Sequence, residues 1–357
     1  MRVGRSRRPD SVKPSREIGE PCEPLLSPSG KLCERTAVNA LVMFVILHVL
    51  FGVATHAQES ATTPPRAGWK LTWADEFNGE TLNPLHWDFD LGDGFYNYEA
   101  NQWIAGWGNN ELQTYTDRQA NVSVVDGRLV ITALKESYQG RGYTSGRLKS
   151  RGRGGQPLVN QRYGRIEIRA KLPTGQGIWP ALWMLPQDES YGTWAASGEI
   201  DILEAKGQEP RTIHGTIHYG GRWPVNTSST ATHELAAGDS IANDHVYAIE
   251  WEPGEIRWYC DEVLYSTKRF WWSSSAVDGG QGRKPTTEAD LNRWPAPFDQ
   301  PFYFVFNIAV GGNFAGAPDP ATRFPAAMEI DYVRVYEPIA GYQSTPKPRG
   351  EGQLPFE

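Results

Sequence analysis

From residue 69 to about residue 337 the chain consists of short stretches with the periodicity of β-strands. In GRIEIRAKLP (residues 164–173) two isoleucines and an alanine fall on one side of an extended chain, and charged residues fall on the other. MEIDYVRVYE (residues 328–337) alternates in the same way. FYFVFNIAVGG (residues 302–312) is apolar at nearly every position, which indicates a strand buried on both faces.

Turn signals separate these stretches. NVSVVDGRLVITAL (residues 121–134) has two β-rich runs around Asp126-Gly127, which is typical of a hairpin, and IRWYCDEVLYS (residues 256–266) indicates a second one. No stretch has the pattern of a long amphipathic helix, and no internal repeat is present. The pattern therefore predicts an all-β fold, an antiparallel sandwich or barrel.

The first 57 residues have a different character. A basic start leads to AVNALVMFVILHVLFGVATHA (residues 37–57), which contains no Asp, Glu, Lys or Arg. Its final THA fits a signal-peptidase site before Gln58. The alternative is an uncleaved membrane anchor, because the apolar run is nearly long enough to span a bilayer. Both readings predict a domain outside the cytoplasm: secreted, periplasmic or at the cell surface.

The rest of the chain divides into a Pro/Thr/Ser-rich linker (58–67), the β-domain (68–338) and a tail (339–357) that we expect to be disordered. A net charge of -7 argues against a nucleic-acid partner. Of the three cysteines only Cys260 lies beyond the apolar run, so no internal disulfide is expected after cleavage. The 14 Trp and 15 Tyr residues suit both a β-core and flat platforms for sugar rings.

The segment GEIDILEAKG (residues 198–207) contains three acids. In a regular strand Glu199 and Asp201 would share one face, and Glu204 would point into the apolar core. Burying an unpaired carboxylate there costs several kcal/mol. A β-bulge between Asp201 and Glu204 would return Glu204 to the face of Glu199. We therefore expect all three acids on one open face.

Acids crowded on one face push their pKa values apart, which suits a retaining glycosidase with one ionised and one protonated carboxyl group. Two other interpretations fit the spacing alone. The strand could be a solvated acidic edge, or the carboxylates could hold calcium.

EIDILE (residues 199–204) resembles the bulged E-x-D-x-x-E signature of glycoside hydrolase family 16, and its context looks most like bacterial laminarinases. The resemblance covers nearly the whole β-domain, in order and spacing. It is carried by WKLTWADEFNG, WGNNELQTYT, YTSGRL, YGRIEIRAKLPTGQGIWPALWMLP, TIHGTIHYGG, FNIAVGGNF and IDYVRVYE. The fold that it implies is a β-jelly roll of two curved sheets with a concave substrate cleft.

The resemblance implies Glu199 as nucleophile, Glu204 as general acid/base and Asp201 as the partner that sets the ionisation of Glu199. TIHGTIHY has a polar face, from which we expect His218 beside Glu204, with His214 as the alternative. The remaining expected substrate contacts are two aromatic rings beside the cleaved sugar and two donors to sugar hydroxyls: Trp179, Trp183, Asn109 and Arg147.

No organic cofactor is expected, since the chain lacks a phosphate loop and a dinucleotide fingerprint. The resemblance implies a structural calcium near Glu76 and Asp331, with ordinary surface acids as the alternative. Two stretches depart from the compact family pattern, residues 92–108 and 269–300. We expect them to shape the ends of the cleft.

Together these observations predict a monomeric endo-glycosidase acting on β-1,3-glucan, with a polysaccharide as its partner and membrane contact only through an uncleaved anchor. The same chemistry on mixed-linkage glucan, agarose, porphyran or carrageenan is the nearest alternative, and transglycosylation is a variant of it. A glucan-binding module without turnover is the alternative of a different class, and the intact acids disfavour it.

Overall fold

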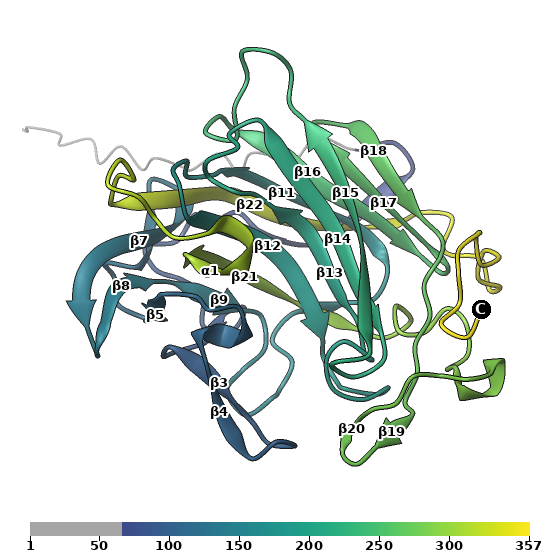
Figure 1. Cartoon of the computed structure of the whole chain (residues 1–357). Coiled ribbons are helices and arrows are strands. Elements are labelled where there is room, and N and C mark those ends of the chain that lie inside the picture. Colours follow the sequence, from purple (N-terminus) through teal and green to yellow (C-terminus); the bar gives the residue numbers. More distant parts are fainter. Residues whose placement is uncertain (1–65) are drawn as a thin grey trace, which may run out of the picture. The chain divides into compact units, whose positions relative to one another are not determined.

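Two β-sheets lie face to face in the computed structural model, which describes residues 66–357 (Figure 1). The first, ten-stranded sheet has the order β18 (Val263–Lys268), β17 (Glu255–Cys260), β16 (His245–Glu252), β11 (Gly164–Lys171), β22 (Ala326–Pro338), β7 (Arg128–Tyr138), β8 (Arg141–Ser145), β5 (Gln113–Tyr115), with β1 (Trp69–Asp75) on β22 and β6 (Val122–Val125) on β7. We call it the outer sheet.

The second, eight-stranded sheet carries the acids, and we call it the inner sheet. Its order is β15 (Asn226–Glu234), β14 (Thr212–Gly220), β13 (Glu199–Glu204), β12 (Ile178–Pro186), β21 (Phe302–Val310), β9 (Arg147–Lys149), β2 (Asp88–Phe89), with β10 (Asn160–Gln161) on β21. Two small hairpins stand apart: β3 (Gly94–Asn97) with β4 (Gln102–Ala105), and β19 (Val277–Asp278) with β20 (Gln281–Gly282).

Helical structure is slight within the described range. It comprises the four-residue α1 (Gly312–Ala315) and two 3-10 turns, η1 (Gly106–Gly108) and η2 (Glu288–Asp290). No helix between residues 66 and 357 combines the length and the apolar character needed to cross a membrane. The signal or anchor expected within residues 1–57 lies outside the described residues, as does most of the linker.

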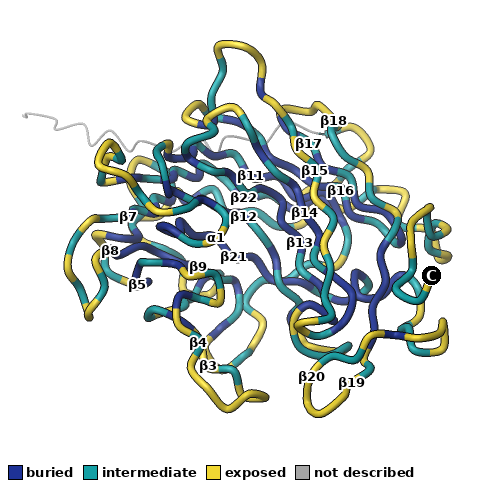
Figure 2. The backbone as a smooth tube through the Cα atoms, viewed as in Figure 1, coloured by how far each residue is buried: buried dark blue, intermediate teal, exposed yellow. Residues whose placement is uncertain are grey.

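The predicted strands and hairpins are confirmed. β6 and β7 meet at Asp126 and Gly127, whose φ angles of 51° and 73° are those of a type I′ turn. In β11 the apolar residues are fully buried between the sheets, and every residue of β21 is buried. Figure 2 shows this burial along the central strands, with exposed residues concentrated in the loops. The core is filled mainly by β-branched and aromatic side chains of both sheets.

Two details differ from the prediction. β5 and β8 pair in parallel, although the other pairs described are antiparallel. The charged face of β11, for which no burial was predicted, is partly buried, since Arg165 is fully buried. Its guanidinium donates to Glu167, Glu250 and Glu262, which satisfies the buried cation.

The segment 269–300 does not present its tryptophans to a substrate. Trp271 and Trp272 are buried, and Trp271 stacks on Trp294 with ring centroids 4.6 Å apart. Ser273 donates to the backbone oxygen of Ala196 at 2.7 Å. The segment therefore packs behind the loop that precedes β13.

The tail 339–357 follows a defined path over the domain, so the prediction of disorder is wrong. Lys347 donates its backbone N–H to Pro253 at 2.9 Å and accepts from the indole of Trp294 at 2.8 Å. Gly352 passes so close to the ring of Phe270 that a Cβ there would lie 2.3 Å from it. The composition of the tail is polar, but these aromatic rings of the domain supply the apolar surface that orders it.

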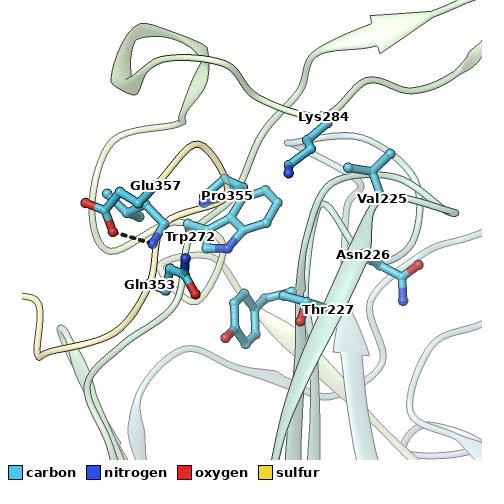
Figure 3. A pocket seen from close by; sticks show the side chains of 10 residues that line it. Val225, Asn226, Thr227, Trp272, Lys284, Gln353, Pro355 and Glu357 are labelled. Atoms are coloured by element: carbon cyan, nitrogen blue, oxygen red, sulfur yellow. Dashed lines mark hydrogen bonds between the residues drawn. The ribbon is translucent and has the colours of Figure 1, made fainter.

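Near its end the tail borders a cavity of about 550 Å³, which is also lined by residues of β14, β15 and the 269–300 segment (Figure 3). Trp272 lies at the centre of this view, between Pro355 and Lys284. The cavity lies on the side of β14 to which Tyr219 belongs, and the acids of the neighbouring β13 lie on the other face of the sheet.

Removal of residues 342–357 should lower the free energy of unfolding by about 2–4 kcal/mol, because Trp294 and Phe270 would lose their cover. Chemical denaturation of the shortened and full-length proteins measures the difference. Lys347→Ala serves as a control, because it removes only the ion pairs that the partly exposed Lys347 makes with Glu252 and Glu255, and it should cost less. Identical unfolding of the shortened protein would show that the tail contributes nothing.

Candidate active site

The acid-bearing strand β13 contains the predicted bulge. Its pairing with β14 is regular up to Asp201 and resumes at Glu204. The two buried residues between them stand opposite the single residue Gly215. Glu204 thereby returns to the half-buried face that carries Glu199, which confirms the expectation drawn from the spacing.

The core side of the bulge is held by Trp258 of the outer sheet. Its indole N–H donates to the backbone oxygen of Asp201 at 2.9 Å. A Cβ at Gly215 would lie 2.4 Å from this indole ring, so only glycine leaves room for it. The bulge, the glycine and the tryptophan thus form one packing unit.

Each glutamate accepts a hydrogen bond from a tryptophan. Trp194 donates from Nε1 to Glu199 at 2.8 Å, and Trp179 donates from Nε1 to Glu204 at 3.0 Å. Asp201 lies between the two glutamates in sequence and is almost fully buried. We call the surface formed here the acid face; it comprises Trp179, Trp183, Glu199, Asp201, Glu204 and His218.

His218 belongs to the acid face, but not where it was expected. Its Nε2 lies 3.5 Å from Glu199 and 3.4 Å from Asp201, and in register it stands opposite Glu199. The residue opposite Glu204 is His214. The expectation that His218 lies beside Glu204 is therefore wrong, because the antiparallel register places the later residue of β14 against the earlier residue of β13.

Burial and mutual repulsion perturb the titration of these groups. Burial raises the pKa of Glu199 to about 7 and that of Glu204 to about 8, and the Asp201 carboxylate adds to both rises. Burial alone would lower the pKa of His218, but Glu199, Asp201 and Glu204 together raise it to about 10. Both carboxyl groups therefore keep a proton to higher pH than an ordinary glutamate does, and His218 is a cation at neutral pH.

Trp183 is fixed by a buried polar network. Its indole donates to Asn307 at 2.8 Å, and the Asn307 amide donates to the hydroxyl of Tyr115 at 3.0 Å. That hydroxyl donates in turn to Glu111 at 3.1 Å. Such a fully paired network holds the ring in one orientation on the acid face.

Arg147 and Asn109, the two expected donors to sugar hydroxyls, already donate hydrogen bonds to other side chains of the protein. The Arg147 guanidinium packs over the rings of Trp107 and Trp183, 4.4 and 4.8 Å from their centroids, and donates to Asp90 at 3.0 Å. Asn109 donates to Glu111 at 3.1 Å. Their contacts position neighbouring aromatic rings, and the predicted role as donors to sugar hydroxyls stays a prediction.

Comparison with known proteins decides the family. Residues 109–271 match the glycosyl hydrolases family 16. A beta-glucanase of Rhodothermus marinus is 41% identical over 86% of this chain and 95% of its own length. The glucan endo-1,3-beta-glucosidase A1 of Niallia circulans is 45% identical over 77% of this chain, which spans only 39% of that longer protein. The chain belongs to glycosyl hydrolase family 16.

Solved structures agree with this membership. The laminarinase from Rhodothermus marinus superposes with a TM-score of 0.60 at 40% identity, over 75% of this chain and 97% of that one. The resemblance on which the sequence interpretation rested is therefore confirmed, together with the jelly-roll fold that it implied.

The expected calcium ligands are engaged otherwise. Glu76 accepts two hydrogen bonds from Arg334, at 2.7 and 2.8 Å, and Asp331 pairs with Arg169. Among the described residues, neither acid belongs to a group of three or more ligating side chains close enough to share an ion. Because arginine already neutralises both carboxylates, their contacts do not fit the predicted calcium site.

Two contributors to the site were missed by the sequence interpretation. Trp194 lies in a loop without periodicity, five residues before Glu199, and nothing in the local pattern indicates its contact. Asn307 was visible as the single polar residue in the apolar run of β21, where a buried amide needs partners. That signal indicates a buried polar network, although it does not place the network beside the acid face.

We predict that His218→Gln shifts the acid limb of the pH–rate profile to higher pH by about one unit. Hydrolysis falls as pH drops through the pKa of Glu199, and loss of the His218 cation raises that pKa further. His214→Gln is the matched control: burial and Lys206 lower the pKa of His214, so its removal takes away no cation. Equal profiles for wild type and His218→Gln would contradict the assigned charge of His218.

Proposed function

We propose that this chain hydrolyses internal bonds of β-1,3-linked glucan with retention of configuration at the anomeric carbon. The observation that carries the proposal is the bulged strand β13, which holds Glu199 and Glu204 on one face with an indole N–H on each. The names of the relatives, a glucan endo-1,3-beta-glucosidase and a laminarinase, support the substrate class.

In the first step the Glu199 carboxylate attacks the anomeric carbon, and Glu204 gives its proton to the glycosidic oxygen as that bond breaks. The product sugar leaves, and the remaining glycosyl group is held as an ester of Glu199. In the second step Glu204, now a carboxylate, takes a proton from water. The hydroxide so formed attacks the anomeric carbon and releases Glu199.

Asp201 and His218 serve this cycle by adjusting charge. The ligating atoms of Glu199, Asp201 and His218 all lie within 4.8 Å of one another. The His218 cation favours the ionised form of Glu199, while the Asp201 carboxylate favours a protonated neighbour. His218 acts on Glu204 as well, but of the two glutamates it pairs only with Glu199, which it faces in the register, so the proton is directed to Glu204.

Tryptophan rings provide the sugar-binding surface in this proposal. Trp179 and Trp183 lie on the same face of β12. The indole N–H of Trp179 donates to Glu204, and that of Trp183 donates to Asn307. Their flat apolar surfaces suit the C–H faces of glucose units. Mixed-linkage glucan, agarose, porphyran and carrageenan are the alternative polymers, and transglycosylation is the alternative second step.

Location and assembly are also part of the proposal. The apolar segment before Gln58 supports export, with cleavage or as an anchor, and we propose that the exported domain acts as a monomer. A glucan-binding module without turnover is the competing function, and the first experiment below separates the two.

Glu199→Gln should lower the hydrolysis rate by several orders of magnitude while the protein stays folded, because an amide cannot form the glycosyl ester. Product release from laminarin, curdlan, lichenan, agarose, porphyran and carrageenan is compared for wild type and variant. Short oligosaccharides from laminarin, absent with the variant, are expected. Release only from a galactan would change the substrate, and no release from any polymer would favour the binding module.

Glu204→Ala should lower the hydrolysis rate about 10²–10⁴-fold. Azide should restore part of the rate on an aryl glycoside. The aryl leaving group departs without a proton from residue 204, and azide attacks the glycosyl ester without needing a general base. Formation of a glycosyl azide with retained configuration, detected by NMR, is the expected readout. If azide has no effect on the variant, Glu204 is not the acid/base residue.

A further inference from the structure

The β3–β4 hairpin stands apart from both sheets, beside β9 (Figure 1). Its base is fixed: Gly92 and Tyr115 exchange two backbone hydrogen bonds of 2.9 Å. Just beyond the base, the backbone oxygen of Asn109 accepts from Asn313 at 2.8 Å. A Cβ on the neighbouring Gly312 would lie 3.1 Å from the ring of Trp179. The base therefore lies at the end of the inner sheet that carries Trp179 and Glu204.

The tip of the hairpin is held at the opposite end of the same strands. Glu99, between β3 and β4, accepts from the Thr193 hydroxyl at 3.0 Å and from Arg222 at 2.7 Å. Thr193 immediately precedes Trp194, the residue that donates to Glu199. Arg222 lies four residues beyond His218, which stands opposite Glu199. The tip therefore lies at the Glu199 end.

A bound polysaccharide must cross these strands. Glu199 and Glu204 are separated along β13, and in a double displacement the two acids act on one bond from different sides. The polysaccharide therefore runs across the strands, from β14 over Trp183 toward Arg147 on β9. Arg147 packs on Trp107, which follows the base of the hairpin. A polysaccharide that extends beyond Arg147 meets the β3–β4 hairpin.

We propose that the β3–β4 hairpin is a barrier across the end of the acid face next to Arg147. Glu99 is then a specificity-determining residue, because its contacts with Thr193 and Arg222, which we call the latch, hold the hairpin in place. This inference rests on the proposed function. The barrier limits how many sugar units bind on the Trp183 side of the cleaved bond, so the wild type releases short products of narrow size range. Opening the latch admits longer chains on that side.

The latch can be removed without unfolding the domain. Glu99 and Arg222 expose 37% and 22% of their side chains, and an ion pair of this exposure contributes little to stability. The base of the hairpin keeps its own backbone hydrogen bonds. Substitution of Glu99 therefore loosens the tip alone.

The test compares full-length wild type with Glu99→Ala on laminarin and on a series of end-labelled β-1,3-gluco-oligosaccharides. Glu99→Ala should yield longer early products from laminarin and raise the ratio of kcat/KM on long to short substrates by up to about fivefold, as expected for one exposed ion pair. The cleavage position in the labelled series should move to leave more units on the Trp183 side.

Charge reversal separates a latch from a merely structural contact. Glu99→Arg and Arg222→Glu should each give the product pattern of Glu99→Ala, and the double variant should restore the wild-type pattern. Glu80→Ala, an exposed glutamate between β1 and β2, is the matched control and should leave the pattern unchanged. The positions of cleavage, not the total rate, are the readout.

Hydrolysis with the same product pattern in wild type, Glu99→Ala and both reversals would overturn the barrier and leave the proposed function intact. A double reversal that fails to restore the wild-type pattern would overturn the latch between Glu99 and Arg222. If the wild type hydrolyses none of these substrates, the proposed function falls and this inference falls with it.

Discussion

The bulge in β13 is the constraint on which the site depends. Without it, the period of the strand would send Glu204 into the apolar core, where an unpaired carboxylate is strongly destabilising. With it, Glu199 and Glu204 share a face, and the displaced residues add to the core instead. The bulge is stabilised from the outer sheet, because Trp258 bonds to the backbone of Asp201 through the gap left by Gly215. Packing between the sheets therefore sets the positions of the Glu199 and Glu204 carboxyl groups.

A second constraint follows from burying charge on that face. Burial raises the pKa of both glutamates, and the Asp201 carboxylate raises them further. The surrounding groups offset this cost selectively: the His218 cation lies against Glu199 and Asp201, while each glutamate has one indole donor. Because His218 pairs with Glu199 and acts on Glu204 without pairing with it, two chemically identical residues have different electrostatic surroundings.

Sequence reasoning reached the parts of this structure that depend on periodicity. The strands, the type I′ hairpin at Asp126-Gly127 and the bulge itself all follow from local patterns of apolar and polar residues. It failed where contacts join residues distant in sequence. The place of His218 depends on the register between two strands, the contact of Trp194 on the path of a loop, and the order of the tail on aromatic rings of other segments.

The two segments that depart from the compact family pattern converge on the same loop. The 269–300 segment bonds to Ala196 from behind, and the β3–β4 hairpin bonds to Thr193 from the side of the acid face. Between these two points lies Trp194, which donates to Glu199. Neither segment contributes a carboxyl group to the acid face. Because both restrain the residue that orients Glu199, variation in their length can change how the acid face receives a polymer without changing the acids themselves.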